Sequence, residues 1–540
     1  MFREVFVDYT SHNLGMMVPT PYSIAISFLI LGIANAATTS AKLPCEPNAN
    51  CLKITKTKTQ NLTEEDFRGS SARKNLKCIY VNGGKIHFIQ EELFSKFLNL
   101  SNLYLKNLPL EGETIKKSLV NSNKTKLTHL CLENVGLTAS LVEGLYPHLP
   151  INLKIFSLRN NSITSLSMDY IPNANIEILD LSYNRNLTLL ISRTSPSLKQ
   201  LLLSYSGFEW NSVFNVHDTC AFPNLTNLEI KGIKVNLSAV DKQNNCFDRI
   251  AVLQLSSCDF VNPIERGSFS FFPTLKSLYL NKISNLNHLP TFKKTTKLVQ
   301  LNLNDVKYTF QPTLENVNSF MNLRKLERLH MQRWKLNLWN SSQLDNLFRP
   351  IVKTIENLDL TSTGLTNIPC IVRKMNELKT LILGNNSISS WDGISEETND
   401  KLKKFWLPFN LIESVDPRVI PRNVLDFNLS GNPFRCTCDL MPYKNWALEK
   451  KITKIIQDWQ THYHCAEPLY WKSKSLSEFR PKKTDCQPFN DYVITALVLC
   501  CLMIVTVVAT AVSKHLKRRC QRRTSQYDGS CERQKLLSGL

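Results

Sequence analysis

The sequence predicts an α/β fold: a horseshoe-shaped solenoid of leucine-rich repeats with a disulfide-bonded cap at each end, followed by one transmembrane helix. Three observations lead to this prediction. An apolar pattern recurs in series, cysteines gather before its first copy and after its last, and one uncharged apolar run near the end of the chain is long enough to cross a bilayer. The 540 residues contain only 17 glycines and no Pro- or Ser-rich linker, which favours one continuous architecture over several globular domains.

The repeated pattern is L-x-x-L-x-L-x-x-(N/C/apolar)-x-L, which fits the chain fifteen times at spacings of 22 to 29 residues. Residues at pattern positions four and six should point inward from a short strand, and each repeat needs a neighbour to cover its apolar edge. We therefore expect these positions to form the core and to have no other function. The copies span residues 76–435 and begin at Leu76, Leu100, Leu127, Leu153, Ile176, Leu198, Leu225, Ile250, Leu275, Leu298, Leu326, Ile355, Leu378, Leu402 and Val424.

Position nine of the pattern normally holds an asparagine whose amide satisfies backbone groups where the chain leaves the strand. Asparagine occupies it at Asn161, Asn184, Asn386, Asn410 and Asn432. Between Leu198 and about Asn376 it is missing, and the two longest repeats lie in the same block. We expect this middle block to be irregular, with changed curvature and looser loops on the convex side. The residues that replace asparagine are Ser206, Ile233, Cys258, Ile283, Val306, Trp334 and Thr363.

Caps are needed because the ends of a solenoid would otherwise expose core. Cys45 and Cys51 lie in the expected N-terminal cap, residues 37–75, and are expected to be disulfide-bonded. The expected C-terminal cap, residues 436–490, has four cysteines, and in a secreted chain their spacing predicts disulfides from Cys436 to Cys465 and from Cys438 to Cys486. Zinc is the alternative for four cysteines, which an oxidising compartment disfavours.

Other cysteines are less clearly paired. Cys220 and Cys246 fall at nearly the same place in consecutive repeats, which predicts a further disulfide between them. Cys258 is expected to be a small buried apolar residue. The sequence suggests no partner for the three cysteines that remain in the repeats, Cys78, Cys131 and Cys370.

The ends of the chain predict a single-pass type I protein of the plasma membrane with its N-terminus outside. Residues 1–36 resemble a signal peptide that ends in Ala34-Asn35-Ala36, although Met1, Met16 and Met17 all remain candidate starts. Residues 493–512 are an uncharged apolar run, and the basic residues that follow mark residues 513–540 as a cytoplasmic tail. The candidate N-glycosylation sites all lie between the two apolar segments, at Asn61, Asn99, Asn123, Asn160, Asn186, Asn224, Asn236, Asn340, Asn385 and Asn428.

The same residues exclude several functional classes. The chain has no GxSxG elbow, HExxH pair or phosphate-binding loop, so we expect no enzymatic activity, catalytic residue, cofactor or metal site. The net charge of +20 could attract anions, but solenoids commonly use lysine to solvate their faces. No basic stripe or aromatic ladder follows the concave strands, which makes nucleic acid an unlikely partner and favours an irregular ligand or a protein. The exposed concave positions should include Tyr80, Tyr104, His129, Cys131, Gln254, Tyr279, Arg328, His330, Lys404 and Trp406, with Asn428 at the end.

The segments SGNPFRCTCDL and IIQDWQTHYHC in the C-terminal cap, the capped repeats and the apolar run resemble the ectodomain and membrane anchor of a Toll-like receptor over residues 45–513. The irregular middle is similar to the subgroup that recognises lipidated bacterial products. This resemblance implies an innate immune receptor or co-receptor that binds a protein or a microbial ligand, with lipids among the candidates. It also implies a heterodimer with a full-length Toll-like receptor. An adhesion or growth-factor-presenting repeat protein is the alternative.

In that subgroup acyl chains enter a convex pocket, which would correspond here to the loops between about Leu298 and Asn376, although long repeats also tolerate plain surface insertions. The 28 residues of the tail are too few for the family's signalling domain, so we expect a decoy, an accessory receptor or a truncated product. Glu532, Leu536 and Leu537 resemble an acidic dileucine signal, which would allow endosomal cycling.

Overall fold

The computed structural model describes residues 45–486 apart from 48–49, 56–59, 68–74, 171–174, 209–213, 217–218, 238–245, 285, 309–310, 392–393, 395–398, 450–451, 453 and 483–485. The chain divides into two compact units, Met1–Asn50 and Cys51–Leu540. Of the first unit only residues 45–47 and 50 are described. The architecture below is that of the second unit.

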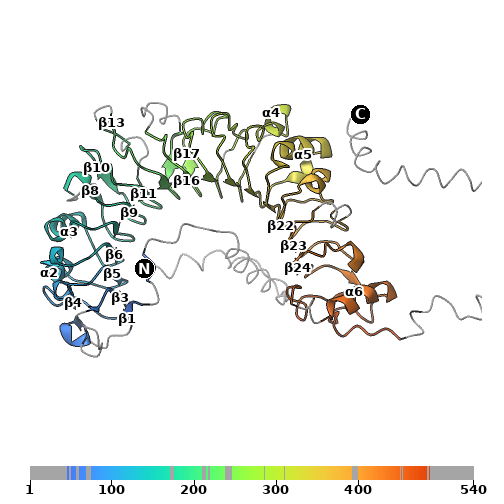
Figure 1. Ribbon diagram of the computed structural model, residues 1–540, viewed down its shortest axis with the longest axis horizontal. Coiled ribbons are helices and arrows are strands. Elements are labelled where there is room, and N and C mark those ends of the chain that lie inside the picture. Colours follow the sequence, from blue (N-terminus) through green and yellow to red (C-terminus); the bar gives the residue numbers. More distant parts are fainter. Residues whose placement is uncertain are drawn as a thin grey trace, which may run out of the picture. The chain divides into compact units, whose positions relative to one another are not determined.

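A single parallel sheet of sixteen strands runs through the second unit and lines the inner side of its curved ribbon (Figure 1). Each strand of this sheet pairs with the strand of the following repeat, so that the order of strands in the sheet follows their order in the sequence. The strands are β1 (Leu52–Ile54), β3 (Cys78–Asn82), β5 (Asn102–Lys106), β6 (His129–Glu133), β7 (Ile155–Ser157), β9 (Ile178–Asp180), β11 (Gln200–Leu202), β14 (Asn227–Glu229), β16 (Val252–Gln254), β18 (Ser277–Tyr279), β19 (Gln300–Asn302), β20 (Arg328–His330), β21 (Asn357–Asp359), β22 (Thr380–Ile382), β23 (Lys404–Trp406) and β24 (Asp426–Asn428).

The fifteen strands from β3 to β24 coincide with the fifteen repeats, and each begins two residues after the predicted start of its repeat. Residues at position four pair with one another, as Leu278 does with Leu301 and Leu329 with Leu358. These leucines are fully buried. The parallel pairing continues through the middle block without a shift of register. The leucine-rich-repeat solenoid predicted from the sequence is therefore present.

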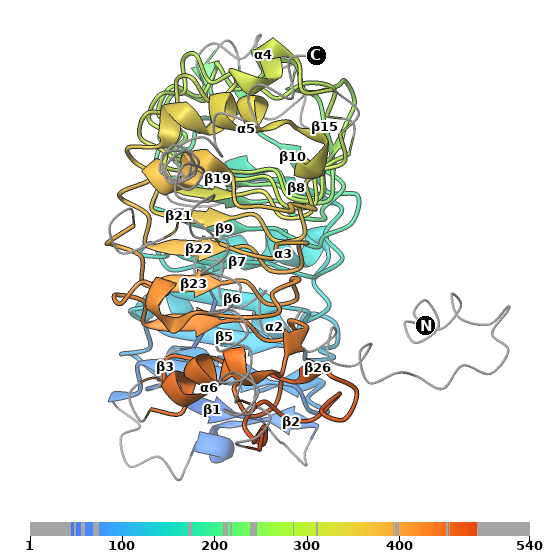
Figure 2. The same ribbon diagram turned by 90° about the vertical axis from the view of Figure 1, so that its right-hand side faces the viewer.

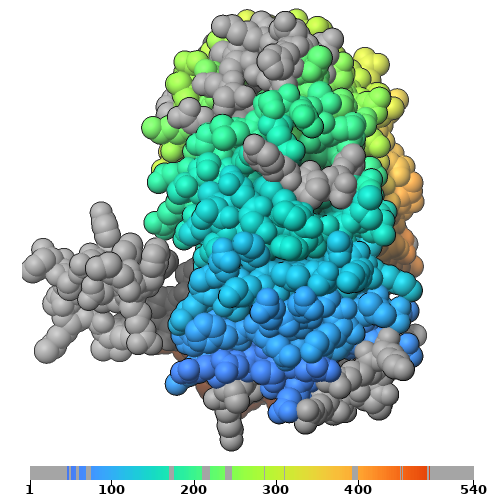
Figure 3. All heavy atoms as spheres, turned by 90° about the vertical axis from the view of Figure 1, so that its left-hand side faces the viewer, coloured from blue at the N-terminus to red at the C-terminus, as the bar shows by residue number. Residues whose placement is uncertain are grey.

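The outer side of the ribbon holds short helices and small sheets (Figure 1). In the space-filling view of the N-terminal half, the described side chains of successive repeats lie in stacked layers (Figure 3). The α-helices are α2 (Thr114–Leu119), α3 (Ala139–Leu145), α4 (Leu314–Val317), α5 (Ser341–Phe348) and α6 (Met441–Ala447). The two-stranded sheets pair β2 (Asn61–Leu62) with β4 (Phe88–Ile89), β8 (Ser165–Ser167) with β10 (Thr188–Leu190), β12 (Asn215–Val216) with β13 (Thr219–Cys220), β15 (Lys234–Val235) with β17 (Asp259–Phe260), and β25 (Phe434–Arg435) with β26 (Cys465–Glu467). The 3-10 helices are Glu64–Phe67, Phe94–Lys96, Ser122–Lys124, Tyr146–His148, Met168–Tyr170, Leu336–Leu338, Arg349–Ile351, Cys370–Lys374, Pro417–Val419 and Cys438–Leu440.

The inward asparagines make the backbone contacts expected of them. The Asn386 side chain accepts hydrogen bonds from the backbone N–H groups of Thr363 and Leu365 at 2.9 and 3.1 Å, and its amide donates to three backbone carbonyls. The residues that replace asparagine in the middle block are all buried. Several of them still donate to the backbone, as the Cys258 thiol does to the carbonyl of Ile230. In the repeats of Ser206, Cys258, Trp334 and Thr363 a side chain thus still bonds the backbone although the asparagine is lost.

The disulfides anchor the ends and one middle loop. In the C-terminal cap, which contains α6 and β26 (Figure 2), the structure joins Cys436 to Cys465 and Cys438 to Cys486. It also joins Cys220 to Cys246, as predicted. Cys78, for which the sequence suggested no partner, is joined to Cys51. Three further cysteines are disulfide-bonded: Cys45, Cys131 and Cys370. Cys258 has a free thiol that is buried, and this burial raises the pKa of the thiol to about 11.

The predicted signal peptide (1–36), membrane span (493–512) and cytoplasmic tail, including Glu532, Leu536 and Leu537, lie outside the described residues. Within the described part of the chain, no helix combines the length and the apolar character needed to cross a bilayer.

Candidate functional site: the position-eight edge

The residue at position eight of every repeat has a positive φ angle, between 52° and 73°. This left-handed conformation turns the chain sharply at the end of the strand and places the position-eight side chain at one edge of the sheet. Glycine and asparagine tolerate it best, but eight of the fifteen residues are of other types. We call this row of residues the position-eight edge: Gly83, Asn107, Asn134, Asn160, Tyr183, Tyr205, Gly232, Ser257, Lys282, Asp305, Arg333, Ser362, Asn385, Phe409 and Gly431.

Neighbouring side chains on this edge contact one another from repeat to repeat. The ring centroids of Tyr183 and Tyr205 are 4.9 Å apart, and the guanidinium of Arg159 lies 4.4 Å from the Tyr183 centroid. Gly232 leaves room for the Tyr205 ring, because a Cβ added there would come within 2.2 Å of it. Tyr183 and Tyr205 nevertheless remain about two-fifths exposed. Exposed tyrosine beside arginine is characteristic of protein-binding surfaces.

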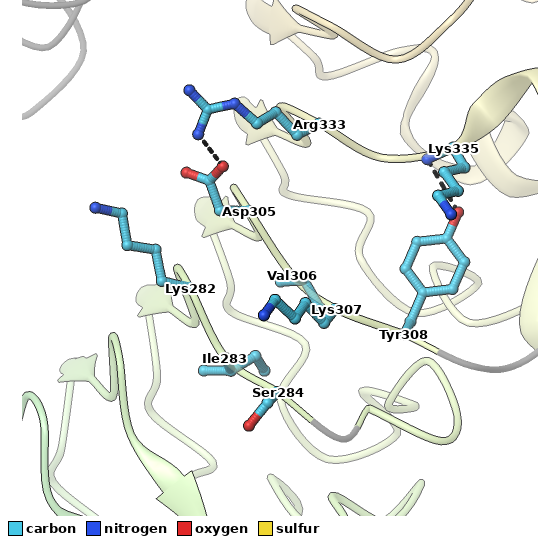
Figure 4. Close-up of a pocket in the computed structure, with 9 residues that line it drawn as sticks. All are labelled: Lys282, Ile283, Ser284, Asp305, Val306, Lys307, Tyr308, Arg333 and Lys335. Atoms are coloured by element: carbon cyan, nitrogen blue, oxygen red, sulfur yellow. Dashed lines mark hydrogen bonds and ion pairs between the residues drawn. The ribbon is translucent and has the colours of Figure 1, made fainter. Parts of the chain in front are cut away.

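Further along the same edge, three consecutive repeats form a hollow of about 700 Å³. Figure 4 shows that Lys282, Asp305 and Arg333 lie in sequence along it and that Lys307 and Tyr308 come from the chain that follows Asp305. We call it the basic hollow. Its lining residues are Lys282, Ile283, Ser284, Asp305, Val306, Lys307, Tyr308, Arg333 and Lys335.

The apolar part of the basic hollow results from the missing asparagines. Ile283 and Val306 stand at position nine, where they are buried. Trp334 occupies the same position in the next repeat, and its ring stacks on Tyr308 with centroids 4.6 Å apart. The Tyr308 hydroxyl accepts a hydrogen bond of 3.1 Å from the backbone N–H of Lys335, and burial raises the pKa of this hydroxyl. Tyr308 is thus held as a neutral, fixed part of the lining.

The rim of the basic hollow is positive. It has four cationic side chains and one carboxylate, and Asp305 pairs with Arg333. Among the described residues, no acidic group forms an ion pair with Lys282, Lys307 or Lys335, and all three are exposed. Three uncompensated ammonium groups around an apolar floor favour a partner that presents carboxylates or other anions.

No candidate glycosylation site lies between Asn236 and Asn340, the interval that contains the basic hollow. Elsewhere, six candidate asparagines are exposed, at Asn61, Asn123, Asn160, Asn186, Asn340 and Asn385, and three are half-buried, at Asn99, Asn224 and Asn236. Asn428 is only 5% exposed, and its side chain accepts a hydrogen bond from the backbone N–H of Ser430. Asn428 is therefore buried in the folded chain, where the C-terminal cap pairs with the neighbouring Phe427.

A second hollow of about 560 Å³ lies on the opposite edge of the sheet, before the strands of four earlier repeats. Its central Glu177 forms ion pairs with Lys154 at 3.2 Å and Lys199 at 2.7 Å. The hydrogen bond from Lys199, followed by that from Lys154, lowers the pKa of this carboxyl. Because these charges are already compensated, this hollow is the weaker candidate. It is lined by Lys126, Thr128, Asn152, Lys154, Asn175, Glu177, Ser197 and Lys199.

Several concave residues predicted to be exposed are buried instead. Tyr104, Cys131, Tyr279 and His330 have exposed fractions of 9% or less. The curvature of the sheet brings side chains of adjacent strands together, so that the Tyr80 and Tyr104 rings are 6.3 Å apart. Of the others, Trp406 has the Lys404 ammonium 3.4 Å from the centroid of its ring. The Trp406 Nε1 donates a hydrogen bond to the Asp426 carboxylate. His129, Gln254 and Arg328 are half-buried on their strands.

Where the resemblance places an acyl pocket, the interior of the repeats is filled. Phe320, Trp334, Leu347 and Phe348 are fully buried between the sheet and the helices α4 and α5. The basic hollow overlaps the first part of the Leu298 to Asn376 interval, but it lies at the position-eight edge and is open. An acyl-chain pocket on the convex side thus stays a prediction.

The comparisons with known proteins agree with the repeats and the C-terminal cap. No protein-family model matches the chain. Toll-like receptor 6 of Dasypus novemcinctus is 22% identical over 510 residues, which cover 84% of this chain and 59% of that receptor. Human Toll-like receptor 1 is 21% identical over 473 residues, with 78% and 59% coverage. The chain is a distant homologue of the Toll-like receptors. It spans less than two thirds of the length of these two relatives.

The solved structures confirm the fold of this Toll-like receptor homologue. Mouse RP105, in its complex with MD-1, superposes with a TM-score of 0.53 at 18% identity and covers 80% of this chain and 83% of its own. The homologue is accordingly a leucine-rich-repeat protein that is similar to the Toll-like receptors, a family that is not enzymatic.

The position-eight edge was not predicted from the sequence. Its left-handed turns could have been predicted, because seven of the fifteen positions hold glycine or asparagine, the residues that best tolerate that conformation. The basic hollow could not be found in this way. Its lysines and arginine look like ordinary solvated surface until the repeats stack and place them side by side.

Proposed function

We propose that this Toll-like receptor homologue is an innate immune receptor or co-receptor that binds a protein partner through the position-eight edge, with the basic hollow at the centre of the contact. The observation that carries the proposal is the coincidence of three features. The basic hollow has three lysines without an acidic partner among the described residues, it lies on the same edge as the tyrosine pair, three repeats further along, and it falls in the longest interval without a glycosylation sequon between the two apolar segments.

Several arguments support a protein as the partner. The basic hollow is open and shallow enough to receive side chains from another surface, and tyrosine and arginine contribute strongly to protein interfaces. The similar mouse RP105 is itself found in complex with a protein, MD-1. A full-length Toll-like receptor ectodomain or a secreted accessory protein with an acidic patch would complement the positive rim.

A microbial lipid with an anionic headgroup is the second candidate. The apolar residues Ile283, Val306 and Tyr308 inside the positive rim favour it. In either case we propose that the chain is held at the plasma membrane as a single-pass type I protein by residues 493–512, with the repeats outside the cell.

The test uses the full chain on the surface of transfected cells and two matched charge-reversal variants. The first changes Lys282, Lys307 and Lys335 to Glu at the basic hollow. The control changes Lys276, Lys297 and Lys403 to Glu, which are exposed lysines outside both hollows. Soluble ectodomains of Toll-like receptors and their secreted accessory proteins are then added, and binding is measured by flow cytometry.

We expect at least one ectodomain to bind the natural chain, to bind the hollow variant about tenfold or more weakly, and to bind the control within about twofold. Equal binding to both variants would reject the basic hollow as the contact. If no ectodomain binds but an anionic lipid copurifies with the natural chain and not with the hollow variant, the lipid candidate replaces the protein candidate.

A further inference from the structure

We propose that the tip of the C-terminal cap, residues 469–474, inserts into the outer surface of the lipid bilayer and holds the cap against the membrane. We call these residues the cap tip. The proposal concerns a different surface from the position-eight edge. It rests on the predicted membrane span, so that its test must separate a failure of the tip from a failure of the span.

The cap tip presents apolar side chains to solvent. Leu469 is 84% exposed, more than any other large apolar residue of the described chain, and the adjacent Tyr470 is 64% exposed. Most other exposed apolar residues are scattered singly along the repeats. Two such side chains in succession form a small apolar protrusion, which is a feature of surfaces that meet a lipid or a protein.

The backbone holds this protrusion in place. The Trp471 N–H donates to the carbonyl of Pro468 at 2.9 Å, and the backbones of Cys465 and Lys474 are joined by a hydrogen bond of 3.0 Å. Cys465 is itself fixed by its disulfide to Cys436. The tip is therefore a hydrogen-bonded turn anchored to the cap, which keeps its shape when Leu469 and Tyr470 face outward.

The composition of the cap tip suits the region of lipid headgroups. Tyrosine, tryptophan and lysine gather at membrane interfaces, where the rings lie at headgroup level and the ammonium groups reach the phosphates. Lys472 and Lys474 are exposed beside the apolar pair, and the Lys474 ammonium lies 5.0 Å from the Trp471 centroid. The nearby Glu467 forms an ion pair with Arg435. Arg480 adds a further exposed positive charge, and the exposed Glu478, two positions earlier, carries a negative charge.

A later segment of the cap packs against this tip. The Trp471 ring packs edge-on against Phe479 with centroids 5.2 Å apart, and Cys486, seven positions after Phe479, is bonded to Cys438. Only six residues, 487–492, lie between Cys486 and Val493, where the predicted span begins. The seven steps of an extended chain from Cys486 to Val493 reach at most about 25 Å. The cap must therefore lie close to the bilayer surface, which makes the lipid the nearest apolar phase for Leu469 and Tyr470.

The test uses the full chain reconstituted into nanodiscs that contain phosphatidylcholine and phosphatidylserine. Leu469 is replaced by the photoreactive residue p-benzoylphenylalanine, and after irradiation the peptides are searched for lipid adducts by mass spectrometry. The control places the same residue at Leu314, which is 71% exposed but lies on α4, far from the cap in the chain. Extraction of the reconstituted chain with alkaline carbonate reports separately on the predicted span.

We expect a lipid adduct at position 469, none at 314, and resistance to carbonate. A second measurement, hydrogen exchange of the backbone at residues 465–474, should be about threefold or more slower in nanodiscs than in a lipid-free amphipathic polymer, and the Leu469→Asp variant should lose this protection. A carbonate-resistant chain with no lipid adduct at 469, or with an adduct only to a second protein, would overturn the proposal while leaving the span intact. Release by carbonate would reject the span and the cap-tip proposal together.

Discussion

The indole Nε1 of Trp334 donates a hydrogen bond of 2.7 Å to the backbone carbonyl of Leu303. In the regular repeats an asparagine at the same position makes this kind of contact, as Asn386 does with the carbonyl of Leu360 at 3.0 Å. A tryptophan can therefore perform the backbone role of asparagine and in addition fill space. The Trp334 ring also stacks on Tyr308 in the basic hollow. This one residue therefore both maintains the solenoid and shapes the candidate site.

Replacement of Trp334 by Phe should lower the free energy of unfolding by about 1 to 3 kcal/mol, because the carbonyl of Leu303 loses its buried donor. Trp391 offers a matched control, because its buried Nε1 has no hydrogen-bond partner among the residues that the structure describes. Trp391→Phe removes an unsatisfied donor and should cost much less. Chemical denaturation of the two variants compares them directly, and equal losses would show that ring size matters more than the hydrogen bond.

Gly232→Ala should destabilise the position-eight edge. The φ angle of +62° disfavours any side chain there, and the new Cβ would force the Tyr205 ring away from Tyr183. Gly83→Ala is the control, since its φ angle is +73° but no atom lies within 4 Å of the added Cβ. Backbone strain alone should cost about 1 kcal/mol at Gly83. We expect the thermal midpoint to fall further for Gly232→Ala, together with a change in tyrosine fluorescence that the control does not share.

Two buried aspartates on the concave strands should respond to pH in opposite ways. Burial raises the pKa of Asp180, despite its hydrogen bonds with Ser182. Burial also acts to raise the pKa of Asp359, but the nearby His330 ring, whose Nδ1 lies 3.8 Å from the carboxylate, and hydrogen bonds from Thr361 and Gln332 outweigh it and lower this pKa.

A raised folded pKa contributes stability that is complete below the unfolded pKa, near 4, and is lost as the pH rises through the folded pKa. A lowered folded pKa contributes stability that is present above about pH 4 and is lost as the pH falls through the folded pKa. Asp180→Asn should therefore raise the thermal midpoint at pH 7 and have little effect at pH 3.5. Asp359→Asn should lower the midpoint at pH 7 by a margin that shrinks in acid. Thermal unfolding at several pH values measures the midpoints of both variants. If both midpoints moved in the same direction at pH 7, the opposite pKa shifts of Asp180 and Asp359 would be contradicted.

The exposure of the candidate asparagines predicts which of them bear glycans in the secreted fold. Asn123 and Asn340 are exposed and should be occupied in most molecules, whereas Asn428 is buried and bonded to Ser430 and should be largely unmodified. Peptide mapping by mass spectrometry after enzymatic deglycosylation measures each occupancy. High occupancy at Asn428 would mean that the end of the sheet is open while the glycan is attached.

The order of the repeats was predictable because it depends on local periodicity. Leu278, Leu301 and Leu329 each follow an apolar residue by three positions, and this spacing alone places them on the inner face of a strand. The role of Trp334 was harder to predict, since a residue that replaces asparagine gives no sign of which carbonyl it will reach. The exposure of Tyr104 and His330 was predicted wrongly, because periodicity takes no account of how tightly a curved sheet packs its inner side chains.

The number of repeats, the strand in each of them and the leucines of the core could be read from the amino-acid pattern, because every repeat needs its neighbour to cover its apolar edge. The candidate site and the partner of Cys78 depend on how the repeats stack in the folded chain. Lys282, Lys307 and Lys335 are 25 and 28 residues apart in the chain (307 − 282 and 335 − 307) and become neighbours only when three repeats stack. Such proximity depends on the length and path of each loop, which the repeated pattern leaves free.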